Sequence, residues 1–386
     1  MELEAVSSAR GLLALRPEWE DLLTQTDGPV FQTPEWFAAW WDVFGQDAEI
    51  RSFVSHSAGT LTGIVPLMIH TVRAGALSIR RLTFAGEHGP FGEYGPIVLP
   101  THGSDLAVAL ASGFRRWGGE FDVLDFHLLD PTSSFSRSST ETFRSTGLTV
   151  RWNPASHPRV TIPLPPTWDR YRVMLSYNER GIIGRHERAL EHHGAEISDI
   201  REGSQLGPAL DELSRLHTEF WSEKGPGGHF ARNPLLGKFL LRVAEYLAPT
   251  DRIRVMTVHA DGKALASLFV LFQGSWCHLY IGGRDAHHPF ARFSPMRVLM
   301  VRAIREAIRR GCRTADFLGG DMRYKLRLGG VQGGYARLTA WQPGIAGWKG
   351  SLFASALSAR DMFDRTPAAP LAARILRRAR ARPWEM

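Results

Sequence analysis

The chain has 386 residues, of which 44% are hydrophobic and 22% are charged. These values exclude an intrinsically disordered chain and are typical of a globular protein with two domains. The net charge of +7 and the isoelectric point near 9.7 favour anionic partners, such as a CoA-type cofactor, a nucleic acid or an acidic membrane face. A genome-wide preference for arginine codons explains the charge equally well.

The two cysteines, Cys277 and Cys312, are each expected in or beside a strand, as reduced thiols of a cytoplasmic protein. Neither the cysteines nor the pairs His192-His193 and His287-His288 have the spacing of a zinc site, so we expect no metal. The first residues lack the pattern of a signal peptide, and no apolar run approaches the ~20 residues of a transmembrane segment.

The first half alternates predicted helices and strands. We expect helices at residues 17–25, 34–44, 105–117 and from 133, and strands at 50–72 (a hairpin turning at Ala58-Gly59), 77–84, 121–129 and 148–152. Residues 153–166 contain five prolines and predict a connection that crosses between domains. This order indicates a mixed α/β first half.

The loop from Gly86 to Gly95 holds four glycines together with His88, Glu93 and Tyr94. Glycines mixed with ionisable side chains are typical of a functional loop, and equally of a solvated hairpin.

The second half begins with residues 168–175. Ser176 and Glu179 form a capping box that opens a helix to His193, and this helix carries Arg180. Such a basic helix is either a solvated face or a lining for an anionic ligand. Helices 205–221 and 234–247 follow, separated by a glycine-rich loop. Trp221, Lys224 and His229 lie in or beside that loop.

Three antiparallel strands are predicted at 252–259, 263–273 and 275–283, with turns at Asp261-Gly262 and Gln273-Gly274. The next helix begins with Ser294 as the expected N-cap and Pro295 as its first residue, and Gly311 ends it. Arg292 and Arg297 flank the helix start, where the helix dipole favours anions. Cations there indicate a bound phosphate, unless they are merely solvated.

A short strand at 314–318 and a turn at Gly319-Gly320 lead to Asp321, Tyr324 and Lys325. Asp316 lies on this strand, and an ion pair between Asp316 and Lys325 is the structural alternative to a catalytic role. A last strand is expected at 334–342, followed by a tail that ends in an arginine-rich run. The tail predicts peripheral contact with an anionic membrane or nucleic acid, or a solvated terminus.

The order of elements in the second half resembles the GNAT acyltransferase fold. The run Ser294-Pro295, Gly311, Asp316-Phe317, Gly319 and Tyr324-Lys325 resembles the CelD/BcsL-type acetyltransferases, relatives of FemAB proteins with two GNAT-like domains. The segments Phe31–Trp36, Asn178–Arg188 and Leu216–Gly225 resemble further motifs of that family. Where its glycine-rich diphosphate loop is expected, residues Asp285–Ala291 contain no glycine.

The resemblance implies an α/β (α+β) fold of tandem GNAT-like domains, each a mixed, mostly antiparallel sheet flanked by helices. We expect an N-terminal GNAT-like domain at 1–160, a C-terminal GNAT-like acyltransferase domain at 161–345 and a basic helical tail at 346–386.

The resemblance also implies transfer of an acyl group, acetyl in the first instance, from acetyl-CoA or another acyl-CoA to an amine or hydroxyl. The acceptor would be a small molecule or a glycan, such as a polysaccharide or envelope precursor. Tyr324 would be the acid, with Asp316, Asp321 and Lys325 as further catalytic candidates. The residues expected to bind CoA are Arg284, Arg292, Ser294, Met296 and Arg297. Those expected to bind the acceptor are His88, Glu93, Tyr94, Arg180, Trp221, Lys224 and His229.

Two alternatives remain open. One is an aminoacyl-tRNA donor, as in FemAB-like peptidyltransferases, which the basic charge fits. The other is a non-catalytic binding module with a degenerate acyltransferase fold.

Overall fold

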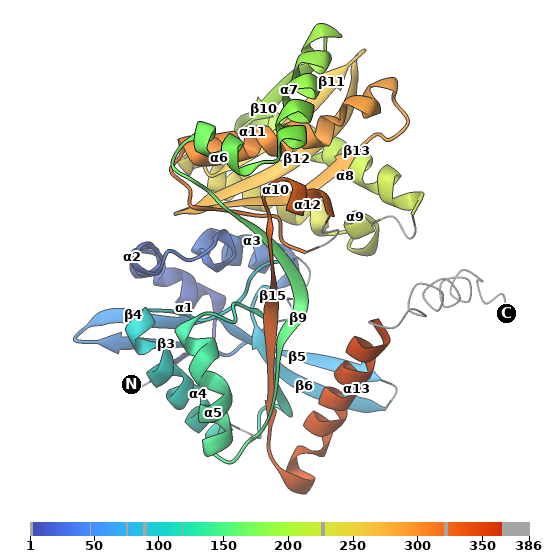
Figure 1. The fold of residues 1–386 in the computed structure, drawn as a ribbon. Coiled ribbons are helices and arrows are strands. Elements are labelled where there is room, and N and C mark those ends of the chain that lie inside the picture. Colours follow the sequence, from blue (N-terminus) through green and yellow to red (C-terminus); the bar gives the residue numbers. More distant parts are fainter. Residues whose placement is uncertain are drawn as a thin grey trace, which may run out of the picture.

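The computed structural model describes residues 3–46, 48–74, 76–87, 91–117, 119–224, 228–319 and 323–364. They form two α/β halves, one below the other in Figure 1. The first half consists of β1 (Glu4–Val6), α1 (Ala9–Ala14), α2 (Arg16–Thr26), α3 (Pro34–Phe44), β2 (Glu49–Ile50), β3 (Ser52–Ser57), β4 (Thr60–Val65), β5 (Leu67–Ala74), β6 (Leu77–Phe84), β7 (Ile97–Val98), α4 (Gly103–Trp117), β8 (Val123–Leu129), α5 (Ser134–Ser145) and β9 (Thr149–Pro163).

The second half has the same alternation of helices and strands. It consists of α6 (Trp168–Met174), α7 (Tyr177–His192), β10 (Glu196–Ile200), α8 (Leu206–Ser222), α9 (Gly228–Arg232), α10 (Leu236–Leu247), β11 (Ile253–Ala260), β12 (Lys263–Gln273), β13 (Trp276–Arg284), the 3-10 helix η5 (Pro289–Phe293), α11 (Pro295–Arg309), β14 (Thr314–Asp316), α12 (Arg323–Arg327), β15 (Val331–Trp341) and α13 (Trp348–Asp364). Among the described residues, no helix is both long and apolar enough to cross a membrane.

An eleven-stranded sheet joins the two halves, in the order β10-β11-β12-β13-β14-β9-β15-β8-β6-β5-β2. The last strand of each half pairs with a strand of the other half: β9 with β14, and β15 with β8. Each half also has one parallel pair that follows a helix, namely β6 with β8 after α4 and β13 with β14 after α11. The two halves therefore repeat one topology and exchange their last strands, which run between them in Figure 1.

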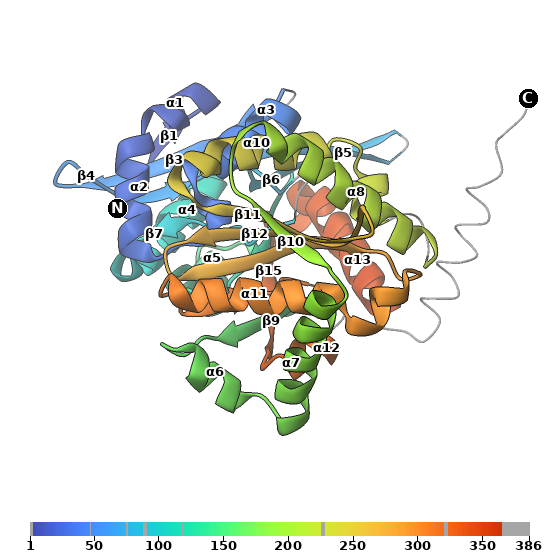
Figure 2. The ribbon, with the colours of Figure 1, turned by 90° about the horizontal axis from the view of Figure 1, so that it is seen from above.

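Helices cover both faces of the second half's strands. Figure 2 shows α8 and α10 on one side of β11 and β12, and α11 on the other side with α6 and α7 beyond it. This arrangement follows from the sequence of α11, because Leu299, Ala303 and Ile304 repeat at helical spacing and are fully buried. Helix α10 also packs on α3 of the first half, so one core cluster spans both halves.

The predicted connection at 153–166 is a strand for most of its length, because β9 extends to Pro163. The strand predicted at 148–152 therefore continues through most of the predicted connection, and this connection does cross between the halves. Pro154 is tolerated because the pairing of β9 with β15 is irregular between Asn153 and His157, so Pro154 opposes no residue of β15 in the ladder. Pro158 and Pro163 stand in the ladder, opposite Gly334 of β15 and Thr314 of β14. The expected boundary between residues 160 and 161 falls inside β9.

Candidate active site between β13 and β14

Strands β13 and β14 run side by side over only three residue pairs, the last of which is His278 with Asp316. β14 ends there, whereas β13 continues to Arg284. Beyond His278 the two parallel strands therefore separate. Residues Leu279–Arg284 of β13 border this gap, and their backbone groups have no partner on β14. Backbone groups on such a strand edge that have no other partner can bind an extended ligand and polarise a carbonyl oxygen.

A β-bulge at Tyr280 marks the point of separation. Phe269 pairs with Ile281 and Val270 pairs with Leu279, so Tyr280 has no opposite residue on β12. The Tyr280 hydroxyl donates a hydrogen bond of 2.9 Å to the carbonyl oxygen of Phe91 in the first half. The glycine-rich loop at 86–95 thus reaches the second half at the predicted site.

The start of α11 lies at the same end of β13. Pro295 is the first helical residue, as predicted, and Met296 packs so closely that a Cβ at Gly282 would lie 2.8 Å from its Cε atom. Ser294 does not cap the helix with its side chain, contrary to the prediction, because its backbone is left-handed with φ 49°. An N-cap hydroxyl reaches the first turn from an extended backbone instead.

The arginines near this helix start differ in their partners. The Arg297 guanidinium lies 2.9 Å from the Glu179 carboxylate of α7, so its charge is largely neutralised. Arg292 in η5 is exposed, and so is Arg284 at the end of β13. Arg292 and Arg284 therefore present exposed positive charge at this end of the sheet.

Arg284 belongs to a small aromatic group at the end of α8. Its guanidinium lies 4.6 Å from the centroid of the Phe220 ring, and the Lys224 ammonium lies 4.1 Å from the same centroid. Trp221 is exposed beside them, with its ring 5.5 Å from that of Phe220. The structure thus brings Arg284 of β13 together with Trp221 and Lys224, which belong to the motif at Leu216–Gly225.

His217 of α8 holds the end of β13 in place and was not among the predicted site residues. Its Nδ1 is 2.9 Å from the Gly282 carbonyl oxygen, and its Nε2 accepts a 3.1 Å hydrogen bond from the backbone N–H of His229. Burial lowers the pKa of His217 to about 4, so the ring is neutral at pH 7. His229 is thereby fixed next to β13 through its backbone, while its side chain is exposed.

Asp316 is fully buried and belongs to an ion-pair network at the base of the gap. The Arg159 guanidinium of β9 lies 2.8 Å from Asp316 and 2.5 Å from Glu93. Burial disfavours the charged Asp316, but Arg159, His278 and the backbone N–H of Leu318 together outweigh burial and lower the pKa of Asp316 to about 2. For Glu93, burial outweighs Arg159 and raises the pKa to about 7. The site therefore contains one permanent carboxylate and one that titrates near neutrality.

His278 completes this network from β13. Its Nδ1 lies 3.7 Å from Asp316, and its ring stacks parallel to that of Trp276 at 5.9 Å. Burial lowers its pKa, so the ring stays neutral beside the Asp316 carboxylate.

Lys325 does not pair with Asp316. It is buried, and its ammonium donates to the carbonyl oxygens of Phe317, at 2.9 Å, and of Gly319. Lys325 therefore holds the turn that follows β14. Tyr324 on the same helix is half-buried with its ring 6.2 Å from that of Phe317.

The remaining predicted residues are spread more widely. Tyr94 is buried in the core of the first half, and burial raises its pKa well above 10. Arg180 is half-buried in the first turns of α7, next to Glu179. His88 and Asp321 lie outside the described residues.

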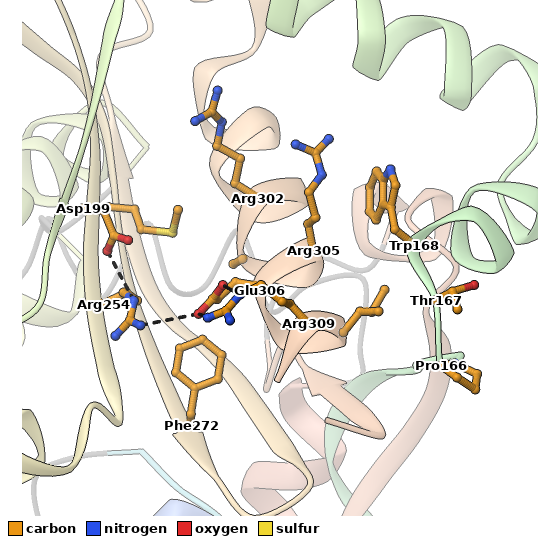
Figure 3. A pocket seen from close by; sticks show the side chains of 13 residues that line it. Pro166, Thr167, Trp168, Asp199, Arg254, Phe272, Arg302, Arg305, Glu306 and Arg309 are labelled. Carbon is orange, nitrogen blue, oxygen red and sulfur yellow. Dashed lines mark hydrogen bonds and ion pairs between the residues drawn. The ribbon is translucent and has the colours of Figure 1, made fainter. Parts of the chain in front are cut away.

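A groove of about 590 Å³ lies elsewhere, on the outer face of α11 between α6 and β11 (Figure 3). None of the predicted site residues lines it. Its arginines are paired: Arg254 and Arg309 with Glu306, and Arg302 and Arg305 with Glu187 of α7. Among all the described residues, the groove included, no three potential ligand side chains lie close enough to hold a metal ion.

Residues 178–326 match the family described as "Acetyltransferase (GNAT) domain". The matched segment contains β13, α11, β14 and all but the last residue of α12, and therefore the whole of the gap just described. The comparison with curated protein sequences found no match.

Solved structures share the fold over nearly the whole chain. FemX is 12% identical with a TM-score of 0.63, and the match covers 88% of this chain and 97% of FemX. A domain from Agrobacterium fabrum, described as the C-terminal domain of a lysylphosphatidylglycerol synthetase, is 13% identical with a TM-score of 0.52 and 91% and 98% coverage. L-PGS from Bacillus licheniformis is 11% identical with a TM-score of 0.51 and 89% and 97% coverage.

These identities show the fold and not the substrate. Residues 178–326 match the GNAT domain family, and 88% of the chain shares its fold with FemX. The predicted fold class is thus confirmed.

Proposed function

We propose that this protein transfers an acyl group, acetyl in the first instance, from acyl-CoA to an amine or hydroxyl of an acceptor. One observation carries the proposal: β13 separates from β14 directly beside the start of α11, within the segment that matches the GNAT family. The gap supplies free backbone groups for the pantetheine arm and the thioester carbonyl. The helix start and the exposed Arg284 and Arg292 supply charge for the diphosphate.

Only some of the residues predicted to bind the diphosphate are placed to contact it directly, so the predicted residues have different roles. Arg284 and Arg292 bind phosphate oxygens directly, whereas Arg297 is held by Glu179 and acts once that pair opens. Ser294 contributes through the shape of its left-handed backbone, and Met296 packs the helix start against Gly282.

Tyr324 is the proposed acid that protonates the leaving thiolate, and Asp321, three residues earlier in the sequence, is a further candidate. Asp316 and Lys325 are positioning residues, because their bonds go to Arg159 and to the carbonyl groups of the turn at 317–319. Glu93 is a base candidate, because its pKa of about 7 lets it accept a proton at neutral pH.

The acceptor binds on the side of the gap that faces the first half, beside Glu93, and His88 is a further candidate from the same stretch of sequence. Tyr94 is buried in the core of the first half and supports this loop from within. The opposite end of the proposed acceptor site is formed by Trp221, Lys224 and His229. Arg180 lies at its flank, where it would bind an anionic acceptor. A glycan or envelope precursor, as in the CelD/BcsL-type enzymes, is the proposed acceptor class. The proposed domains are residues 1–160, 161–345 and 346–386. The proposed location is the cytoplasm, where the protein would use acyl-CoA.

The second candidate is an aminoacyl-tRNA donor, as in FemAB-like proteins. The shared fold with FemX and the net charge of +7 favour it. A tRNA donor contacts many phosphates, so its binding weakens steeply with salt, whereas a CoA diphosphate contacts few.

Calorimetric titration of the purified protein with acetyl-CoA, CoA and bulk tRNA, each at low and high salt, separates the two donors. Saturable acetyl-CoA binding that survives high salt supports the first candidate. Salt-sensitive tRNA binding without acetyl-CoA binding supports the second. Binding of neither donor, together with binding of a glycan, would leave a non-catalytic module.

A further inference from the structure

Five large apolar side chains are exposed around the helix that carries Tyr324 and Lys325. Val173 and Met174 end α6 and Tyr177 begins α7, with 73%, 49% and 82% of their surfaces exposed. Leu326 of α12 is 42% exposed and Val331 at the start of β15 is 55% exposed. We call these five residues the α6–α12 surface.

The two segments of this surface are held side by side. The Tyr171 hydroxyl of α6 donates a 2.8 Å hydrogen bond to the carbonyl oxygen of Leu328, which follows α12. Leu175 and Leu328 belong to one core cluster, and Leu175 lies 4.0 Å from where a Cβ at Gly329 would stand. Figures 1 and 2 both place α12 next to the α6–α7 corner.

Arginines surround the apolar side chains. Arg170 and Arg172 of α6 are exposed, as are Arg323 and Arg327 of α12, whereas Asp169 is the single exposed acid in the described parts of 168–180 and 323–331. Monomeric soluble proteins rarely expose large contiguous apolar patches, and such patches with a polar rim often mark sites of interaction with a protein or a membrane. The positive rim disfavours a second copy of the chain as the partner, because the four arginines of two such surfaces would repel one another.

An anionic membrane satisfies both parts of the surface. Apolar side chains insert at the boundary between headgroups and acyl chains, tyrosine prefers that boundary, and arginines bind the lipid phosphates. A nucleic acid would use the arginines but would leave the valines, the leucine and the methionine in water.

We infer that the α6–α12 surface binds an anionic membrane, so that the acceptor reaches the gap from a lipid surface. The link to the acceptor rests on the proposed function, whereas the membrane contact does not. The contact is also distinct from one made by the arginine-rich tail, since it uses residues of α6, α7, α12 and β15.

The test is co-sedimentation with vesicles of phosphatidylcholine alone or with about 30% phosphatidylglycerol, in the absence of acyl-CoA. We expect binding to the mixed vesicles and little to phosphatidylcholine alone. Val173→Ser/Leu326→Ser should weaken the binding about tenfold. The matched control is Val108→Ser/Leu235→Ser, which exchanges the same residue types at sites that are 51% and 45% exposed on α4 and before α10. It should bind as the wild type does.

Two further variants assign the charge contribution. Arg172→Gln/Arg327→Gln should weaken binding to the mixed vesicles about tenfold, whereas Arg377→Gln/Arg378→Gln/Arg380→Gln in the tail should retain most of it. The inference is overturned by equal binding of the wild type and the Val173→Ser/Leu326→Ser variant, by no binding of the wild type, or by loss of binding in the tail variant alone. It is also overturned if Val173→Ser/Leu326→Ser and its control Val108→Ser/Leu235→Ser differ in tRNA binding but bind vesicles equally. Calorimetry with acetyl-CoA is independent of all these outcomes, so it judges the proposed function separately.

Discussion

Arg159 of β9 donates two hydrogen bonds, of 2.8 and 3.1 Å, to the buried carboxylate of Asp316 on β14. The first half of the chain repeats this relationship, because Arg337 of β15 donates two hydrogen bonds of 2.6 Å to the buried carboxylate of Asp125 on β8. In both cases the aspartate faces a threonine of the exchanged strand, and the arginine lies two residues before that threonine. The exchanged strands are thus fixed by one ion pair in each half.

The Asp316→Asn substitution should destabilise the fold. It removes a charge from a buried pair and leaves Arg159 with Glu93 alone, which should lower the free energy of unfolding by about 3 kcal/mol. Asp125→Asn, which disturbs the equivalent pair, should lower it by a similar amount. The exposed control, Asp169→Asn, should leave it unchanged. Urea unfolding followed by circular dichroism measures all three, and a loss below about 1 kcal/mol for Asp316→Asn would contradict the role of the pair.

Glu93 should make the stability depend on pH near neutrality. Its pKa is raised from 4.5 to about 7, so the folded protein binds its proton more tightly than the unfolded chain does. The free energy of unfolding should therefore fall as the pH rises from about 4.5 to 7, by on the order of 3 kcal/mol for this group. The free energy of unfolding of Glu93→Gln should decline less steeply over that range. Some decline should remain in this variant, because burial also raises the pKa of Glu87 to about 7. Parallel curves for the variant and the wild type would contradict this assignment.

Local sequence signals predicted the secondary structure near the site well. Pro295 begins α11, Gly311 follows it with φ 77°, and the three antiparallel strands lie where the turns placed them. These features depend on neighbouring residues. The prediction of Ser294 as the N-cap failed because tertiary packing sets its backbone conformation. The predicted strand at 148–152 was too short because the five prolines after it indicated a loop, whereas β14 and β15 pair with this segment.

The site network was harder to predict because its partners are distant in sequence. Asp316 meets Arg159 across 157 positions, and Tyr280 meets Phe91 across 189. One signal was available: Arg159 and Thr161 recur as Arg337 and Thr339, just as Asp125-Phe126 recurs as Asp316-Phe317. That internal repeat would have linked Arg159 to Asp316.

Gly283 should be intolerant of a side chain. A Cβ there would lie 2.3 Å from the backbone nitrogen of His217, and a backbone cannot rotate away as a side chain can. Gly283→Ala should therefore push α8 off β13 and cost about 2 kcal/mol or more of stability. The control, Gly207→Ala in the first turn of α8, meets no atom within 4 Å and should be neutral or stabilising by about 0.5 kcal/mol. Thermal unfolding compares them, and equal melting temperatures would refute the close contact.

Tyr324→Phe should slow acyl transfer without abolishing donor binding. Loss of a general acid typically lowers kcat by about 10²–10⁴-fold, while the ring that packs on Phe317 remains. The control is Tyr246→Phe on α10, where the hydroxyl bonds to exposed Asp42. Release of free thiol from acetyl-CoA in the presence of an acceptor mixture measures the rate. An unchanged rate in Tyr324→Phe would remove this residue from the chemistry.

Binding of acetyl-CoA at the start of α11 is the central claim, and isothermal titration calorimetry tests it most directly. The variant is Arg284→Gln/Arg292→Gln, and the control is Arg309→Gln, an exposed arginine at the other end of the same helix. We predict saturable binding to the wild type and the control, weakened about tenfold or more in the double variant. Absence of binding to the wild type, or equal affinity of the double variant and the wild type, would contradict the claim.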